Sequence, residues 1–340
     1  MTLPELTSQV SLTLPDGRLN PAAVGWARQP LINTDGIGRD GKRFWGRNKR
    51  WEYWAVTTPT HIVALTASDI DYAAVDEIWV FDRATQQTWG ATATVVPRGG
   101  VTLPGTLGGG PVRADAKNLA IAIDDDDAGT RLRARAVAKD GTRLAFDIVA
   151  ELPPGHERLA VVVPWSETRF QYTVKDVGRP AEGMLTIGTE TYAVPAGKSW
   201  ATLDHGRGRW PYEMRWNWGA GAGVSHGKTI GLQVGGKWTV GTGSTENAVT
   251  VDGRLHNIPV ELNWDYDIEN WQEPWRITGG GLDATFTPFY DKASHSKLLV
   301  LSSRTDQCFG TWSGTFQPES SEIVKFDNLT GWAEEVHNRW

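Results

Sequence analysis

The sequence has one cysteine, Cys308, so it can form no intrachain disulfide, and it has no CxxC pair for zinc or redox chemistry. It contains no run of about 18 apolar residues, so no membrane-spanning helix is expected. The N-terminus lacks the basic start, apolar core and small-residue cleavage site of a secretion signal. These absences predict a cytoplasmic protein with no integral membrane segment.

The sequence also has fewer basic than acidic residues. Lys and Arg total 34 against 40 Asp and Glu, which gives a formal net charge of -6, so nucleic acid is not an expected partner. The seven histidines form no HxH or HExxH pattern, and the acidic run 124–127 lacks the spacing of a calcium loop, so we expect no metal. No nucleotide loop or nucleophile elbow is present, and we expect no cofactor.

Tryptophan, in contrast, is abundant. The chain has 18 tryptophans in 340 residues, and eight of them lie between Trp200 and Trp275. Indole rings can line an apolar cavity, stack on a sugar or hold a cation, and each also supplies one N–H donor. A packed core is the other use of such a cluster. The composition predicts an aromatic surface, used for packing, for a small-molecule ligand or for both.

The periodicity is that of strands and turns. Residues 131–137 alternate apolar and charged side chains, and a turn at Asp140-Gly141 leads into a second alternating run. Further hairpin turns are predicted at Gly235-Gly236 and Asp252-Gly253. The only helix predicted is a short one within 330–340, where Trp332, Val336 and Trp340 follow a spacing of four. The sequence therefore predicts an all-β protein with at most short helices.

The segment RWNWG, residues 215–219, has the pattern of an amphipathic strand. If it is extended, Trp216 and Trp218 lie on one face and Asn217 on the other. We therefore predict that all three line a binding site, with a tryptophan-rich core as the alternative.

Acidic residues accompany aromatic ones in the segment 263–276. Asp265 and Asp267 fall on one face of a strand, and a carboxyl packed against apolar rings would keep its proton near neutral pH. A solvent-exposed strand and turn is the alternative. The neighbouring candidates for substrate binding are Trp264, Tyr266, Trp275 and Arg276.

Two further residues are candidates for catalysis. Glu246 follows a glycine-rich stretch that could bring the backbone close to a ligand, and it could pair with an aspartate as in a glycoside hydrolase. His226 lies in the tryptophan-rich half and could carry a proton, although a turn residue is the alternative.

Several segments resemble a bacterial protein family, the domain-of-unknown-function family 2804, over residues 25–340. The segments are KRWEYWAVTT, RFQYTVKD, GRWPYEMRWNWG, GTGSTENAVTVDGRLH, EPWRI, TPFYDK, DQCFGTWSG and GWAEEVHNRW. That family is remotely similar to the carotenoid hydratases and tocopherol cyclases. The resemblance implies two lipocalin-like antiparallel β-barrels in tandem, which we expect at 25–168 and 169–340, after an N-terminal extension at 1–24.

The resemblance also implies a chemistry, since carotenoid hydratases protonate a carbon–carbon double bond in an apolar cavity. Their Asp-His-Asn-Trp-Gly stretch aligns with Arg215 to Gly219, but Trp216 stands where the histidine would be. A second acid of that group, an aspartate near a tyrosine, corresponds loosely to Tyr266 with Asp265 or Asp267.

Three functions remain open from the sequence. The first is acid-catalysed hydration, cyclisation or isomerisation of an unsaturated, isoprenoid-like substrate, with the acid at Asp265 or Asp267. The second is a glycoside hydrolase that uses paired carboxylates and tryptophan stacking. The third is a lipocalin-like binder of small molecules without catalysis. The sequence sets neither the substrate nor the oligomeric state.

Overall fold

The computed structural model describes residues 3–38, 44–298, 301–318 and 322–339. The only helix that lies wholly within these ranges is one turn of 3-10 helix, η1 (Pro21–Ala23), and no helix in them is long and apolar enough to span a membrane. The remaining regular structure consists of strands, and nearly all of their pairings are antiparallel. The predicted all-β fold is therefore confirmed.

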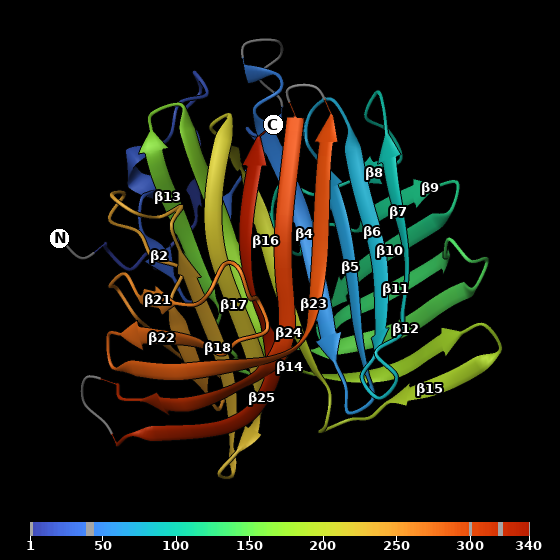
Figure 1. The fold of residues 1–340 in the computed structure, drawn as a ribbon. Coiled ribbons are helices and arrows are strands. Elements are labelled where there is room, and N and C mark those ends of the chain that lie inside the picture. Colours follow the sequence, from blue (N-terminus) through green and yellow to red (C-terminus); the bar gives the residue numbers. More distant parts are fainter. Residues whose placement is uncertain (1–2, 39–43, 299–300, 319–321, 340) are drawn as a thin grey trace.

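Most strands of the first half of the chain form one 14-stranded sheet (Figure 1). A separate parallel pair, β1 (Val10–Ser11) and β3 (Ile32–Asn33), precedes it. The strands of the sheet are β2 (Trp26–Ala27), β4 (Asn48–Thr57), β5 (His61–Asp69), β6 (Ala74–Asp82), β7 (Thr88–Val95), β8 (Val101–Thr102), β9 (Val112–Ala116), β10 (Leu119–Asp126), β11 (Gly129–Val137), β12 (Arg143–Glu151), β13 (Leu159–Ser166), β14 (Arg169–Ile187), β15 (Glu190–Val194) and β16 (Trp200–Arg209).

The rest of the chain forms a nine-stranded sheet with the order β20-β19-β18-β17-β25-β24-β23-β22-β21. Its strands are β17 (Glu213–Ser225), β18 (Lys228–Gly236), β19 (Ala248–Val251), β20 (Arg254–Asn257), β21 (Asn263–Asp265), β22 (Trp275–Gly279), β23 (Leu282–Leu298), β24 (Leu301–Phe316) and β25 (Val324–Arg339).

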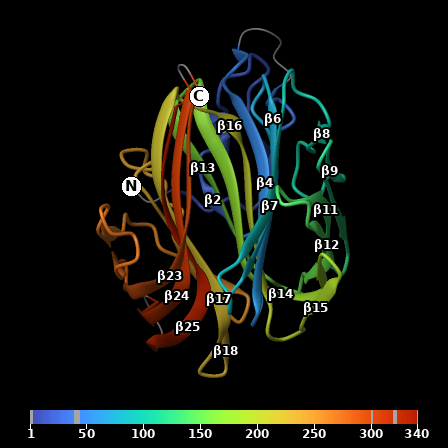
Figure 2. The ribbon, with the colours of Figure 1, turned by 45° about the vertical axis from the view of Figure 1, so that its right-hand side comes forward.

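Each sheet is strongly curled into a half-barrel, and the two curled sheets pack side by side (Figures 1 and 2). Long strands make the bend: β14 pairs with β13 and β16 through its first half and with β12 and β15 through its second half. The predicted class of two antiparallel β-barrel-like units is thus present as two curled sheets, the first of which extends through β16. The predicted boundary at 168/169 lies in the turn between β13 and β14, and the division into domains stays a prediction.

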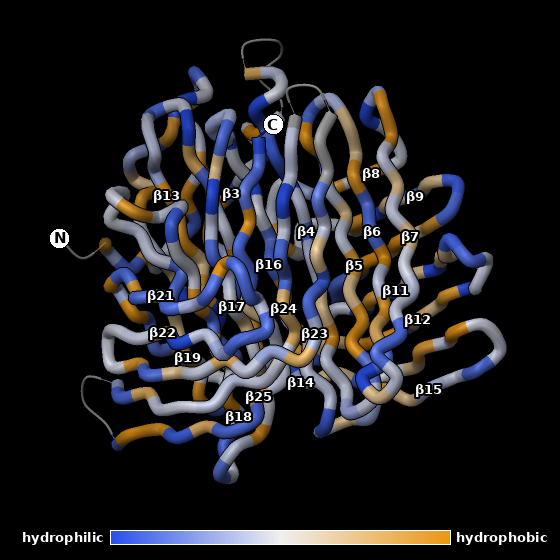
Figure 3. Tube along the Cα trace, in the orientation of Figure 1, coloured by the Kyte–Doolittle hydropathy of each residue, from blue (hydrophilic) through white to orange (hydrophobic). Residues whose placement is uncertain are grey.

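The core has three main parts. One apolar cluster fills the concave side of the first sheet, where apolar residues recur along β5, β6, β11 and β12 (Figure 3), and a second fills the second sheet. A third cluster lies between the sheets and is largely aromatic, with Trp79, Phe81, Trp218, Phe309 and Trp332. The sheets are therefore joined by packed rings, and polar residues in that layer are withdrawn from water.

The local predictions had mixed outcomes. The hairpins at Asp140-Gly141 (β11–β12) and Asp252-Gly253 (β19–β20) are confirmed. The hairpin at Gly235-Gly236 is wrong, because β18 ends there and pairs with β19 after a loop at 237–247.

The helix predicted at 330–340 is also wrong, because residues 324–339 form strand β25. A spacing of four is an even number, so Trp332 and Val336 share a strand face as readily as a helix face. Trp340 lies outside the described residues.

Candidate active site

Four charged side chains meet in the layer between the two sheets, and we call them the acid-rich cluster: Lys175, Asp204, Glu246 and Glu334. Lys175 Nζ lies 2.9 Å from Asp204 Oδ1 and 3.7 Å from Glu246 Oε1. All four residues are at least nine-tenths buried. One ammonium group therefore faces three carboxyl groups away from bulk water.

Strand register brings these residues together. Lys175 of β14 lies directly opposite Asp204 of β16, so their side chains leave the first sheet on the same face. Glu334 of β25 lies opposite Trp218 of β17, and this pair points back from the second sheet. Gly206 leaves space for the indole of Trp51, because a Cβ at position 206 would lie 2.1 Å from that ring.

Each carboxyl group of the cluster accepts a hydrogen bond from a different indole. Trp51 Nε1 donates to Asp204 at 3.1 Å, Trp216 Nε1 donates to Glu334 at 3.0 Å, and Trp238 Nε1 donates to Glu246 at 2.7 Å. The ring of Trp218 faces Lys175 Nζ, whose distance to the ring centroid is 4.2 Å. Tryptophans thus hold the acids in position and also supply aromatic surface around them.

Two of these acids hold their protons unusually well. Burial raises the pKa of Glu246 to about 7 and that of Glu334 to about 7, and the negative charge of Asp204 adds to both effects. Lys175 and the indole donors oppose the rise without cancelling it. The pKa of Lys175 is also raised: burial lowers it, but the acidic neighbours Asp204 and Glu246 outweigh that effect, so the ammonium stays charged. Both glutamates are therefore suited to give up a proton near neutral pH.

The cluster and the residues around its indoles also have buried polar atoms that could bond a substrate. Within the described parts of the chain, no donor reaches Glu246 Oε1 with normal hydrogen-bond geometry, and no acceptor reaches Gln171 Nε2. Trp51 and Trp216 are only half-buried, so the indoles border both the acids and the surface.

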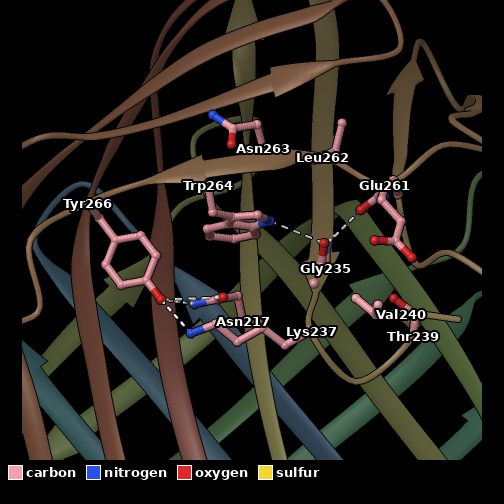
Figure 4. Close-up of a pocket in the computed structure, with 12 residues that line it drawn as sticks. Asn217, Gly235, Lys237, Thr239, Val240, Glu261, Leu262, Asn263, Trp264 and Tyr266 are labelled. Atoms are coloured by element: carbon pink, nitrogen blue, oxygen red, sulfur yellow. Dashed lines mark hydrogen bonds between the residues drawn. The ribbon is translucent and has the colours of Figure 1, made fainter.

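A separate cavity of about 250 Å³ lies in the second sheet, and we call it the Tyr266 pocket (Figure 4). Three residues predicted to bind substrate line it: Asn217, Trp264 and Tyr266. The Tyr266 hydroxyl accepts hydrogen bonds from Lys237 at 2.7 Å and Asn217 at 3.0 Å, and it donates to Glu335. Burial, followed by the Glu335 carboxylate, raises the pKa of Tyr266, so the phenol stays protonated.

The acid-rich cluster and the Tyr266 pocket lie on opposite faces of one wall formed by β17, β25 and the end of β18. Consecutive residues divide between the faces: Trp216 and Asn217, Lys237 and Trp238, Glu246 and Asn247, and Glu334 and Glu335. The first two strands alternate because side chains of an extended strand point to opposite sides. A ligand in the Tyr266 pocket would therefore be separated from Glu246 and Glu334 by this wall.

The remaining predicted residues lie elsewhere. Asp265 and Asp267 are exposed, so the expectation that one of them is buried is wrong: Asp265 ends the edge strand β21, and Asp267 lies in the segment that follows it. Arg276 is exposed and pairs with Asp283 at 3.0 Å. Together with Tyr266 and Glu273, these residues line an open groove beside the Tyr266 pocket.

His226 and Trp275 have structural surroundings. His226 lies in the exposed turn between β17 and β18 and pairs with Asp327 at 2.8 Å. Trp275 is fully buried and stacks on the ring of Tyr266 at 4.2 Å, so it supports the pocket from within the core. The roles assigned to these residues in catalysis and binding stay predictions.

Three members of the acid-rich cluster were absent from the predicted site: Lys175, Asp204 and Glu334. The signal that could have found them is a charged residue within an otherwise apolar strand, as in TVKDV and ATLDHG. Such a residue must find a buried partner or face water. The sequence does not say which, because the partner comes from a distant strand.

No set of three or more His, Cys, Asp or Glu residues in the described ranges is arranged to hold a metal ion. The acid-rich cluster has an internal cation in Lys175, whose ammonium lies between the carboxyl groups of Asp204 and Glu246.

Comparison with protein families identifies the chain. Its sequence matches the DUF2804 family, a domain of unknown function, over residues 4–340. The protein is a member of the DUF2804 family. The expected family is thus confirmed over nearly the whole chain, while a search of curated protein sequences gives no match.

Solved structures show the same fold at low sequence identity. Kievitone hydratase from Nectria haematococca is 13% identical with a TM-score of 0.53, and the alignment covers 91% of this chain and 96% of that one. A candidate AttH from Nitrosomonas europaea is 14% identical with a TM-score of 0.50, covering 85% and 92%. At this identity the likeness shows that the fold of this DUF2804 protein is shared, and the chemistry must be argued from its own residues.

Proposed function

We propose that this DUF2804 protein is an enzyme that protonates an unsaturated, largely apolar small molecule at the acid-rich cluster, leading to hydration, cyclisation or isomerisation. The observation that supports it is a pair of buried glutamates, Glu246 and Glu334, whose pKa values are both raised to about 7 among tryptophan rings. A general acid works best when its pKa lies near the working pH.

In the proposed first step, the protonated carboxyl of Glu246 gives its proton to one carbon of a double bond. The π electrons form the new C–H bond, and positive charge remains on the other carbon. Lys175 stabilises the glutamate carboxylate that is left, because its ammonium lies 3.7 Å away. The neighbouring indole faces stabilise the cation, as the ring of Trp218 already does for the ammonium of Lys175.

The cation can then follow one of three routes, each of which balances. Water can add to it and lose a proton to a carboxylate of the cluster, which gives hydration. A second double bond can attack it and a proton can then be lost, which gives cyclisation. Direct loss of a different proton moves the double bond, which gives isomerisation. In every route a proton returns to the cluster, so Glu246 ends the cycle protonated.

A labelling experiment tests this chemistry before the substrate is identified. The protein is incubated in D₂O with a panel of isoprenoid alcohols, polyenes and prenylated phenols, and products are analysed by mass spectrometry. Protonation from the cluster places deuterium on carbon, and hydration adds a further D₂O-derived mass. Glu246→Gln should lower the labelling rate by about 10²–10⁴-fold, the usual contribution of a general acid.

Controls separate chemistry from stability. Asp267→Asn, at an exposed carboxyl, should label at the wild-type rate, and the melting temperature of Glu246→Gln should stay close to that of the wild type. Full labelling by a Glu246→Gln, Glu334→Gln double variant would overturn the assignment. Saturable binding of a panel member with no deuterium uptake would instead favour a non-catalytic binder of small molecules. The glycoside hydrolase function stays a prediction, and release of the aryl alcohol from aryl glycosides tests it.

A further inference from the structure

We propose that the Tyr266 pocket is a second ligand site, distinct from the acid-rich cluster, and that it takes a single sugar ring of the pyranose type. The inference does not rest on the proposed chemistry, because the pocket lies on the reverse face of the wall. Its lining combines aromatic rings with amide, hydroxyl and carboxyl side chains (Figure 4).

The charges of the pocket favour a neutral ligand. The ammonium of Lys237 is paired with Glu335 at 2.6 Å, and it also bonds the hydroxyl of Tyr266. Glu261 is the one carboxylate among the lining residues, and it is exposed. An anion would face the carboxylate of Glu261, and a cation would face the ammonium of Lys237. A neutral molecule meets neither repulsion.

The polar groups of the pocket favour hydroxyls on that ligand. Lys237, Glu261 and Asn263 are exposed polar residues of the lining, and a purely apolar guest would take their polar atoms from water without replacing the lost hydrogen bonds. Hydroxyl groups both donate and accept, so they can bond amide, ammonium and carboxylate neighbours alike.

An aromatic ring supplies the flat contact that a sugar ring needs. Trp264 is half-buried and lies between Tyr266 and Glu261 in Figure 4. Its Nε1 donates to the carbonyl of Gly235 at 3.2 Å, which fixes the ring. Gly236 makes room for it, because a Cβ there would lie 2.9 Å from Nε1. The fixed indole can receive the apolar C–H face of a pyranose while the side chains around it bond the ring hydroxyls.

The size of the cavity limits the ligand to one ring. About 250 Å³ is below the usual range for drug-sized ligands, which is roughly 300–1,000 Å³. The ring could come from a free monosaccharide or from the end of a longer glycan, and the two share the same chemistry within the pocket.

Ligand-observed NMR tests the proposal on the intact protein. The probes are methyl pyranosides of glucose, galactose, mannose and xylose, a disaccharide for the glycan source, and cyclohexylmethanol as an apolar ring of similar size. We expect saturable binding of at least one pyranoside and none of cyclohexylmethanol. Competition by the disaccharide would assign the glycan source, and its failure to compete would assign the free sugar.

Variants locate the binding. Trp264→Ala should weaken it about tenfold or more, and Glu261→Ala, at an exposed residue, should weaken it about fivefold. Glu269→Ala, an exposed acid outside the pocket, is the matched control and should bind as the wild type does. If Trp264→Ala does not fold, Glu261→Ala decides alone.

Results of two kinds would overturn the proposal. One is the absence of saturable binding by every sugar of the panel. The other is binding that Glu261→Ala leaves unchanged or that Glu246→Gln removes, since the latter would place the sugar on the acid-rich face. Glu246→Gln with intact sugar binding and lost labelling keeps the two proposals separate, so either can fail without the other.

Discussion

Two neighbouring residues of β14, Lys175 and Asp176, point to opposite faces of the strand and enter two different buried ion clusters. Lys175 joins the acid-rich cluster, in which one cation faces three carboxyl groups. Asp176 joins the reverse arrangement, which we call the base-rich cluster: His156 Nε2 lies 2.7 Å from its carboxylate, with Arg179 at 3.5 Å and Arg158 at 3.7 Å.

The balance of charge gives the two clusters opposite proton affinities. Burial by itself would raise the pKa of Asp176, but Arg158, His156 and Arg179 outweigh it and hold that pKa well below the ordinary value. In the acid-rich cluster the single lysine does not outweigh burial, and the pKa values of Glu246 and Glu334 are raised. Burial alone therefore does not make a proton donor: a shortage of positive charge is also needed.

The largest expected effect breaks the base-rich cluster. Asp176→Asn should lower the free energy of unfolding by about 3–5 kcal/mol, because it leaves Arg158 and Arg179 buried without their counter-charge. Glu246→Gln should cost no more than about 1 kcal/mol at pH 7, because an amide replaces a carboxyl that is already half-protonated. Urea unfolding of the two variants measures both values. Equal losses would contradict the division into a structural and a functional cluster.

The dependence of stability on pH should differ in sign between the clusters. Between about pH 4.5 and 7 the native protein holds protons on Glu246 and Glu334 that the unfolded chain releases, so stability falls as the pH rises, by at most roughly 3 kcal/mol for each glutamate. Asp176 acts at the other end: its contribution is present above its unfolded pKa near 3.8 and is lost as the pH falls below that value.

Unfolding measured from pH 3 to pH 9 tests this contrast. Glu246→Gln should flatten the loss of stability between about pH 5 and 8 and leave the acid limb unchanged. Asp176→Asn should flatten the acid limb alone. If Glu246→Gln leaves the slope above pH 5 as it is in the wild type, the raised pKa is wrong.

The smallest expected effect concerns the exposed acids. Asp265→Asn and Asp267→Asn should each change the free energy of unfolding by no more than about 0.5 kcal/mol, because both side chains face water. Their deuterium-labelling rates should equal that of the wild type. A loss of labelling in either variant would return catalysis to the acids first predicted from the sequence.

Much of the fold could be predicted from residue patterns. The alternation in 131–137 and the Asp-Gly turns identified two hairpins. Both patterns are local, because the conformation of a strand or tight turn depends mainly on the residues within it. The predicted helix at 330–340 failed because Trp332 and Val336 are also compatible with one face of a strand, and pairing with β17 and β24 decides between the two. The periodicity of a short segment carries no information about a pairing strand such as β17, which lies more than a hundred residues earlier in the chain.

The candidate site shows the same limit. The sequence by itself determined that an all-β chain rich in tryptophan carries Trp216 and Trp218 on one face and Asn217 on the other, because strand geometry fixes that alternation. Only the tertiary structure decided which carboxyl groups lose contact with water. Glu246 is buried because the two sheets close over it, whereas Asp265 is exposed at β21, the edge strand of its sheet. Proton affinity depends on burial and on every nearby charge, and both are set by strands far apart in the chain.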